Sequence, residues 1–215
     1  MHWNEGAVSA IWSRPAQAAG TTWIVLGHGA GGNLHSPDLA QFAEAMSARG
    51  VGAVRFNFPY AEAKRRIPDR QATLEACYRA VAEAAAERVT AGPPRLVLGG
   101  RSMGGRIASH VVAAGFPAAG LLFLAYPLHP PAQPDRLRDA HLGKITIPML
   151  FLQGSRDAFA RPDLLAKTVA ALPTATLHVV DGGDHGLKVR GRAAKDVRAE
   201  IVEVAVGWVR SLPKA

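Results

Sequence analysis

The chain has 215 residues, of which 48% are hydrophobic and 20% charged, a composition typical of a globular protein with a sizeable core. These values exclude a disordered, collagen-like or coiled-coil chain, and we expect one domain spanning residues 1–215. The formal net charge is +8, from 25 Lys and Arg against 17 Asp and Glu. Such an excess occurs in proteins that bind nucleic acid or membrane surfaces, where the basic residues are clustered.

Targeting and redox signals are weak in this sequence. No apolar run reaches the length of a membrane span, and the first residues lack the basic and apolar regions of a signal peptide. The single cysteine, Cys77, excludes an internal disulfide and a multi-cysteine metal site. We therefore expect a cytoplasmic protein without a membrane partner and without a bound metal.

Short apolar segments alternate with longer alanine-rich segments along the chain. Several of the short segments are apolar at every position, as expected for strands covered on both faces. The predicted strands are 7–12, 23–26, 53–58, 95–98, 121–125, 149–153 and 176–180, and the predicted helices are 36–49, 69–90, 103–114, 161–171 and 192–210. This alternation predicts an α/β fold with a mostly parallel, twisted sheet of about seven strands and helices on both faces.

The strongest functional motif is Gly100-x-Ser102-x-Gly104, between the strand 95–98 and the helix 103–114. A serine between glycines at a strand–turn–helix junction is typical of a nucleophile elbow, which exposes the hydroxyl above the sheet. The helix that follows adds N–H groups and a positive dipole end near developing negative charge. A glycine-rich turn without catalytic function is the alternative, and the strand and helix on either side favour the nucleophile.

A serine nucleophile needs a base, and the base needs a carboxylate to orient it. Among the eight histidines, His185 alone lies in a polar loop just after the last predicted strand. Asp157 follows the preceding strand and is the predicted carboxylate; Asp181 and Asp184 are alternatives, although consecutive side chains such as those of Asp184 and His185 rarely face each other. The chain order Ser102, Asp157, His185 is that of the α/β-hydrolases.

An oxyanion site is predicted at residues 27–32 (GHGAGG), which follow the strand 23–26. The expected donors are the N–H groups of Ala30 and Met103, with Gly31 as the substitute for Ala30. A phosphate-binding loop is the alternative, but the Lys-Ser/Thr of a P-loop is missing. The predicted reaction is acyl transfer from an ester, thioester or lactone to water, and it requires no metal or organic cofactor.

These motifs resemble those of the α/β-hydrolase superfamily across nearly the whole chain, and more narrowly its compact dienelactone-hydrolase-like branch. The sequence is also similar to a little-characterised group of predicted hydrolases that includes a testis-expressed protein and a subunit of the NSL chromatin-modifying complex. The resemblance rests on residues 27–32 (GHGAGG), 56–60 (FNFPY), 64–66 (KRR), 68–70 (PDR), 100–106 (GRSMGGR), 126–131 (YPLHPP), 153–157 (QGSRD) and 183–185 (GDH). It implies Ser102, Asp157 and His185 as the triad and implies no particular substrate.

The sequence is short for the superfamily. Only one predicted strand, 7–12, precedes the strand 23–26 that leads into the loop 27–32, and residues 126–148 are too few for a full cap domain. We expect residues 126–131 to form a proline-braced lip beside an open pocket that favours small or exposed substrates. Tyr126 and His129 either contact substrate there or pack the lip.

Basic residues also lie near the predicted site. Arg101 precedes the nucleophile, and Arg65 and Arg66 belong to a basic turn; both places either bind an anionic substrate or are simply solvated. The alternative to an enzyme is a non-catalytic scaffold that binds a ligand or a partner. Nucleic-acid binding is disfavoured, because the basic segments contain no interleaved aromatic residues and no known motif. The sequence leaves open whether the protein is a monomer or a homodimer.

Overall fold

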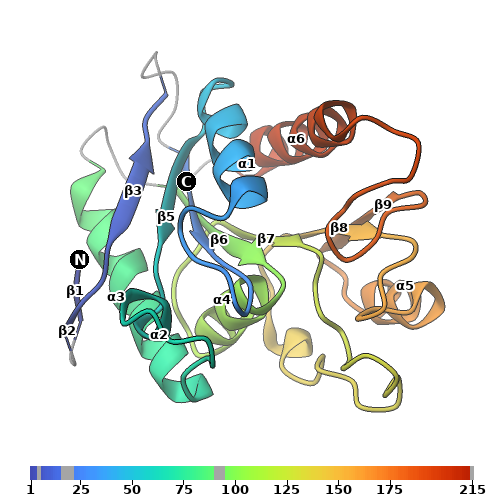
Figure 1. Ribbon diagram of the computed structural model, residues 1–215, viewed down its shortest axis with the longest axis horizontal. Helices are drawn as coiled ribbons and strands as arrows, with labels where there is room; N and C mark the ends of the chain where they lie inside the picture. Colours follow the sequence, from blue (N-terminus) through green and yellow to red (C-terminus); the bar gives the residue numbers. More distant parts are fainter. Residues whose placement is uncertain (4–5, 16–21, 90–94, 214–215) are drawn as a thin grey trace.

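The computed structural model describes residues 1–3, 6–15, 22–89 and 95–213. A seven-stranded sheet occupies the centre, in the order β3-β5-β4-β6-β7-β8-β9 (Figure 1). All neighbouring strands are parallel except β3, which runs antiparallel to β5. The strands are β3 (Ala10–Ser13), β4 (Thr22–Gly27), β5 (Gly52–Phe56), β6 (Arg95–Arg101), β7 (Gly120–Leu124), β8 (Met149–Gly154) and β9 (Ala175–Val180).

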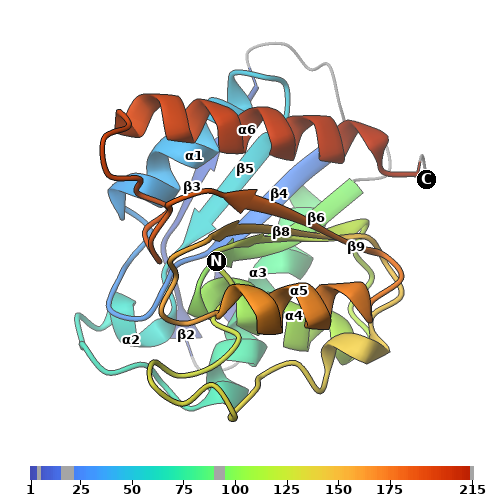
Figure 2. The ribbon, with the colours of Figure 1, turned by 90° about the vertical axis from the view of Figure 1, so that its right-hand side faces the viewer.

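Helices cover both faces of the sheet, with α1 and α6 on one face and α3, α4 and α5 on the other (Figure 2). The helical elements are α1 (Pro37–Ser47), α2 (Pro59–Glu62), α3 (Gln71–Arg88), α4 (Met103–Ala113), the 3-10 turn η1 (Leu142–Lys144), α5 (Pro162–Ala170) and α6 (Ala194–Ser211). The predicted α/β architecture is therefore confirmed, and the described part of the chain contains no full cap domain. Within the described residues, no helix is long and apolar enough to cross a membrane.

The first predicted strand, 7–12, is wrong in its extent. Residues Gly6–Ala7 form β2, which pairs with β1 (His2–Trp3) in a separate hairpin, and β3 begins only at Ala10. The chain turns between them because the N–H of Val8 donates to the carbonyl of Met1, and the N–H of Ser9 donates to the Glu62 carboxylate. These long-range partners leave no periodic signal in the sequence.

Other predicted boundaries differ by a few residues. The predicted strand 53–58 ends at Phe56, because the next two residues bind the loop after β4: Asn57 Oδ1 accepts from the N–H of Leu34, and the N–H of Phe58 donates to the His28 ring. The short helices α2 and η1 were not predicted, since four or three residues carry too little periodicity. The end of the predicted helix 69–90 lies outside the described residues, at Thr90.

The direction of the sheet order changes at β4. From β4 the chain adds β5 on one side and then β6, β7, β8 and β9 on the other. In open α/β sheets, ligands bind outside the carboxyl ends of the strands at such a switch point. Here that point lies between Gly27 at the end of β4 and Gly100 in β6, which face each other in the register.

The backbones at this switch point approach too closely to admit a side chain. A Cβ on Gly104 would lie 2.1 Å from the carbonyl oxygen of Gly27, and a Cβ on Gly100 would lie 2.2 Å from the same oxygen. Gly100 also has a φ of +145°, which other residues rarely adopt. Strand β4 and the first turn of α4 can therefore meet only through glycines.

Gly104→Ala should destabilise the protein by about 2 kcal/mol or more, because the new methyl group has no space and its neighbours are backbone atoms. Gly207→Ala, in the exposed middle of α6 with no atom near the added Cβ, should instead stabilise it by about 0.5–1 kcal/mol. Denaturant unfolding of both variants measures the two changes. Equal effects at the two positions would contradict the close approach described above.

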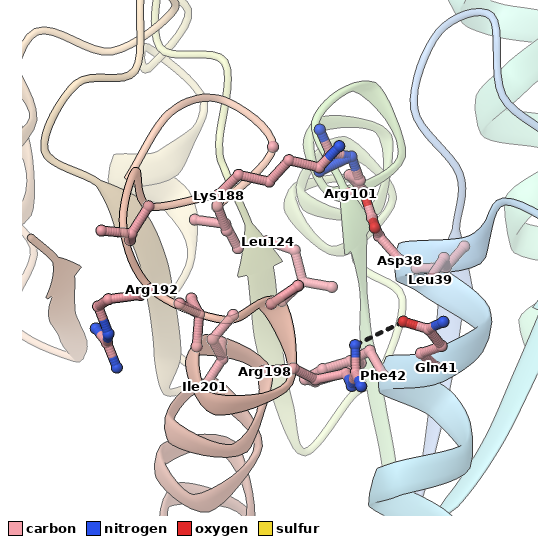
Figure 3. Close-up of a pocket in the computed structure, with 15 residues that line it drawn as sticks. Asp38, Leu39, Gln41, Phe42, Arg101, Leu124, Lys188, Arg192, Arg198 and Ile201 are labelled. Carbon is pink, nitrogen blue, oxygen red and sulfur yellow. Dashed lines mark hydrogen bonds between the residues drawn. The ribbon is translucent and has the colours of Figure 1, made fainter. Parts of the chain in front are cut away.

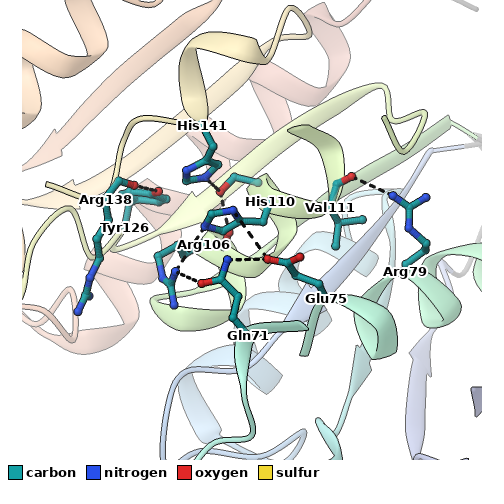
Figure 4. A network of polar contacts seen from close by, with 10 residues as sticks. Gln71, Glu75, Arg79, Arg106, His110, Val111, Tyr126, Arg138 and His141 are labelled. Atoms are coloured by element: carbon teal, nitrogen blue, oxygen red, sulfur yellow. Dashed lines mark hydrogen bonds and ion pairs between the residues drawn. The ribbon is translucent and has the colours of Figure 1, made fainter. Parts of the chain in front are cut away.

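A polar network ties α4 to α3 and to the segment before η1 (Figure 4). The rings of His110 and His141 stack with centroids 3.6 Å apart, and His141 Nε2 lies 2.7 Å from Ser109 Oγ. Because the Ser109 hydroxyl donates its proton to the carbonyl of Arg106, the histidine must donate to the serine. Burial and the neighbouring His110 and Arg106 lower the pKa of His141 to about 4.

This low pKa makes His141 a source of acid sensitivity. The folded-state pKa lies below the unfolded value of 6.5, so the neutral ring contributes its full stability above pH 6.5 and loses it as the pH falls towards 4. We expect His141→Asn to flatten the decline of the free energy of unfolding between pH 6.5 and 4. His35→Asn, at an exposed loop position, is the matched control and should keep the wild-type slope. Urea titrations at a series of pH values measure both slopes.

Candidate active site

Ser102 lies at the turn between β6 and α4 with a φ of +49° and a ψ of −115°. A non-glycine residue in such a conformation costs about 1–3 kcal/mol and persists only where the surrounding structure enforces it. Enforcement comes from the tight packing around Gly100 and Gly104 and from the N–H of Ser102, which donates to the carbonyl of Leu124 at 2.9 Å. The turn therefore holds Ser102 at the carboxyl edge of the sheet.

The structure brings Ser102, His185 and Asp157 into one continuous chain of hydrogen bonds. His185 Nε2 lies 2.9 Å from Ser102 Oγ, and His185 Nδ1 lies 2.8 Å from Asp157 Oδ2. A carboxylate only accepts hydrogen bonds, so Nδ1 carries the proton and Nε2 is left free to accept from the serine hydroxyl. This arrangement gives the imidazole the tautomer that a general base needs.

Asp157 is buried, and its carboxylate accepts three hydrogen bonds. Besides His185, Gln153 Nε2 donates to Oδ2 at 2.5 Å, and the N–H of Phe159 donates to Oδ1 at 2.8 Å. These bonds fix the carboxylate in the turn that follows β8, and they offset the cost of burying its charge.

The structure distinguishes Asp157 from the two alternative carboxylates. Asp184 Oδ1 accepts from the backbone N–H of Lys188, and Asp181 Oδ1 accepts from the Ser155 hydroxyl. Asp184 thus stabilises its own turn, and within the described residues neither side chain forms a hydrogen bond with the His185 ring.

His185 is also held by an aromatic contact to its ring and by a hydrogen bond to its backbone carbonyl. Phe159 packs against it with ring centroids 4.3 Å apart, and Arg101 Nη2 donates to the His185 carbonyl at 2.9 Å. The His185 side chain is 23% exposed, so the ring remains accessible while these contacts fix its orientation. Arg101 therefore positions the loop of the histidine.

The loop after β4 is anchored by two buried side chains. His28 Nδ1 donates to the Gly29 carbonyl at 2.9 Å, and its Nε2 accepts from the N–H of Phe58 at 3.1 Å, so both ring nitrogens are used. The Tyr60 hydroxyl donates to the same Gly29 carbonyl at 3.3 Å. Burial lowers the pKa of His28, which keeps the ring neutral as these bonds require.

This anchoring sets the direction of the next N–H group. In a planar trans peptide, the N–H of Ala30 points opposite to the Gly29 carbonyl and therefore away from His28 and Tyr60. A Cβ built on Gly29 would lie 3.7 Å from Ser102 Cβ, so the loop runs directly beside the serine. Met103 is the first residue of α4, where backbone N–H groups lack a partner within the helix.

The structure favours packing among the two roles left open for the lip residues Tyr126 and His129. Tyr126 is fully buried, and its hydroxyl donates to the carbonyl of Arg138; His129 is 2% exposed, and its Nε2 accepts from the N–H of Arg161. Both side chains pack the protein and leave no polar atom for a substrate. His129 also donates its own N–H to the carbonyl of Phe159, so it braces the segment that packs on His185.

The basic candidates lie in two different surroundings. Arg65 and Arg66 are exposed in the turn after α2, and Arg65 forms an ion pair with Asp69. Arg101, by contrast, borders two cavities on the α1 side of the site, one of about 110 Å³ beside residues 28–32 and one of about 270 Å³ between α1 and α6. Of these arginines, the structure brings Arg101 to the candidate site.

Three supporting residues were missed by the sequence analysis: His28, Gln153 and Phe159. His28 belongs to the predicted loop and Gln153 to a predicted strand, so position alone marked neither as a hydrogen-bonding residue of the site. A polar side chain at the end of an otherwise apolar strand, such as Gln153, is the one available signal.

His28→Phe should destabilise the protein by about 2 kcal/mol or more, because the Phe58 N–H loses a buried partner and the Gly29 carbonyl loses another. Tyr60→Phe removes one long bond from a carbonyl that also accepts from the N–H of Gly32, so it should cost about 1 kcal/mol or less. Denaturant unfolding measures both. A larger loss in Tyr60→Phe than in His28→Phe would contradict the assigned anchoring.

Comparison with known proteins agrees with this fold. Solved structures similar to this chain include an alpha-beta serine hydrolase homologue from Coxiella burnetii, at 18% identity and a TM-score of 0.79 over 97% of this chain and 95% of that one. They also include dienelactone hydrolase from Anabaena variabilis, at 14% identity, a TM-score of 0.78 and coverage of 99% and 95%. A serine hydrolase without lid from Xanthomonas campestris has 21% identity, a TM-score of 0.75 and coverage of 99% and 93%. The sequence profile of the alpha/beta hydrolase domain matches residues 20–211, and the chain belongs to that family.

Proposed function

We propose that this protein is a serine hydrolase that cleaves small carboxylic esters, thioesters or lactones through an acyl-enzyme. The observation that carries the proposal is the His185 imidazole, which lies within hydrogen-bonding distance of both Ser102 Oγ and the buried carboxylate of Asp157. The structural neighbours include a dienelactone hydrolase and an esterase domain, which supports the same class of reaction.

The first half-reaction uses the geometry directly. His185 Nε2 takes the proton as Ser102 Oγ attacks the substrate carbonyl, and Asp157 stabilises the resulting imidazolium. The negative charge on the carbonyl oxygen is received by the N–H groups of Ala30 and Met103. The imidazolium then gives its proton to the departing alcohol or thiol, and the acyl group remains on the serine.

Water completes the reaction by the reverse set of roles. His185 removes a proton from water as the water oxygen attacks the acyl carbonyl, and the collapse of the intermediate returns the proton to Ser102 Oγ. No step draws on a metal or an organic cofactor. Because the described residues form no full cap domain over the strand ends, we expect small or exposed acyl groups to be preferred.

Within the family, we also place this chain near the group of predicted hydrolases to which its motifs 56–60, 64–66 and 126–131 are similar. The support comes from sequence resemblance alone. It favours a hydrolase of still undefined substrate over one with the specificity of any single structural neighbour.

Ser102→Ala should lower kcat/KM for p-nitrophenyl acetate by about 10³-fold or more and should abolish labelling by a fluorophosphonate probe, since the nucleophile is gone. Asp157→Asn should cause a loss of similar order, because the histidine loses the carboxylate that selects its tautomer. Steady-state kinetics and mass spectrometry of the labelled protein measure these effects.

Ser211→Ala is the matched control, because Ser211 is exposed at the end of α6 and its hydroxyl donates to the carbonyl of Trp208, within the same helix. It should keep wild-type kinetics and labelling. A folded wild-type protein that neither reacts with the probe nor hydrolyses activated esters would replace this proposal with a non-catalytic binding scaffold.

A further inference from the structure

The larger cavity beside the site has an apolar interior that the proposed mechanism does not use. It has a volume of about 270 Å³ and lies between α1 and α6, near the carboxyl edge of the sheet (Figure 3). Its interior is formed by buried side chains from both helices, from β7 and from the loop after His185: Leu39, Phe42, Leu124, Leu187, Val197 and Ile201. Pockets of this kind commonly bind the apolar part of a small molecule.

The charged residues around this cavity are mostly basic. Four basic side chains line it, against the single carboxylate of Asp38: Arg101, Lys188, Arg192 and Arg198. Arg192 forms an ion pair with Glu200, and it extends away from the cavity in Figure 3. Arg198 donates to the neutral amide oxygen of Gln41 at 2.6 Å, so its charge is not cancelled by that contact.

Two of the cations converge at one end of the cavity. The side chain of Lys188 extends towards Arg101 (Figure 3), and within the described part of the chain neither has a carboxylate within 4.0 Å. Arg101 is fixed by its bond to the His185 carbonyl, and the backbone of Lys188 is fixed by two bonds with Asp184. Like charges held near each other are unfavourable until an anion binds between them.

We propose that this cavity binds an amphipathic carboxylate, with its aliphatic or aromatic part between α1 and α6 and its anionic head at Arg101 and Lys188. The N-terminal turn of α6 supports the same ligand, because Ala194 and Val197 line the cavity and a helix N-terminus favours negative charge. The site lies one residue from Ser102 and one residue from His185, through Arg101 and Gly186. It is a binding site for an acid, and its existence does not depend on the nucleophilicity of Ser102.

Calorimetric titration of the Ser102→Ala protein with octanoate, octanol and octylammonium tests this inference without any hydrolysis. Octanoate should bind, octanol should bind about tenfold more weakly, and octylammonium should not bind, because the three share a chain and differ in head-group charge. Equal affinity for octanoate and octylammonium, or no octanoate binding, would overturn the proposal. Since the nucleophile is absent in this protein, the result is independent of whether the wild type hydrolyses esters.

Lys188→Gln should weaken octanoate binding by about tenfold, the loss expected for one charge-assisted contact. Lys195→Gln is the matched control, because Lys195 is exposed in the first turn of α6 and does not line the cavity. It should leave the octanoate affinity within about twofold of the parent, since it removes the same charge at a greater distance. The same loss in both variants would show a general effect of net charge and would refute the site.

Discussion

The contact between the backbone of β4 and the first turn of α4 is the constraint on which the rest of the site depends. Gly104 and Gly100 both meet the Gly27 carbonyl at distances that exclude any Cβ. This approach places Ser102 and the loop after β4 side by side at the point where the order of the sheet changes direction. A serine on a looser turn would keep its hydroxyl but would lose its fixed position relative to Gly29 and Ala30.

Buried polar side chains around the site stabilise this contact by hydrogen bonds to the backbone and to Asp157. The Tyr78 hydroxyl of α3 lies within 2.6–2.8 Å of the Val25 carbonyl and of both the N–H and the carbonyl of Gly99, so it bonds the two strands that carry the site. Burial raises the pKa of Tyr78, which keeps the hydroxyl protonated. His28 fixes the loop after β4 in a similar way, and Gln153 fixes Asp157. Hydrogen bonds from groups outside the reaction therefore hold the site in place.

The sequence sufficed to predict the fold and to expect Ser102, Asp157 and His185 at one place, because the carboxyl ends of parallel strands meet at one edge. Only the structure could assign Tyr126 and His129 to packing, since burial depends on how residues 126–131 fold back against the segment after β8. The hydrogen bonds that support the site could not be predicted from the sequence either. The periodicity of α3 predicts that Tyr78 faces the core, but its hydrogen-bond partners lie on two strands distant in the sequence.

Part of the excess positive charge lies beside the candidate site, around the cavity between α1 and α6. The basic segment 188–198 runs from the loop of His185 into α6, so three of its basic side chains, Lys188, Arg192 and Arg198, border the cavity between α1 and α6. Recognition of a nucleic acid requires cations spread along an accessible surface, where they follow the phosphate backbone. Cations around a small apolar cavity instead favour a ligand that has both an anionic head and an apolar body. A ligand with only one of these parts would lack either the ionic contacts or the apolar contacts. In the proposed function, the loop of His185 thus connects the nucleophile Ser102 with the inferred site for acids.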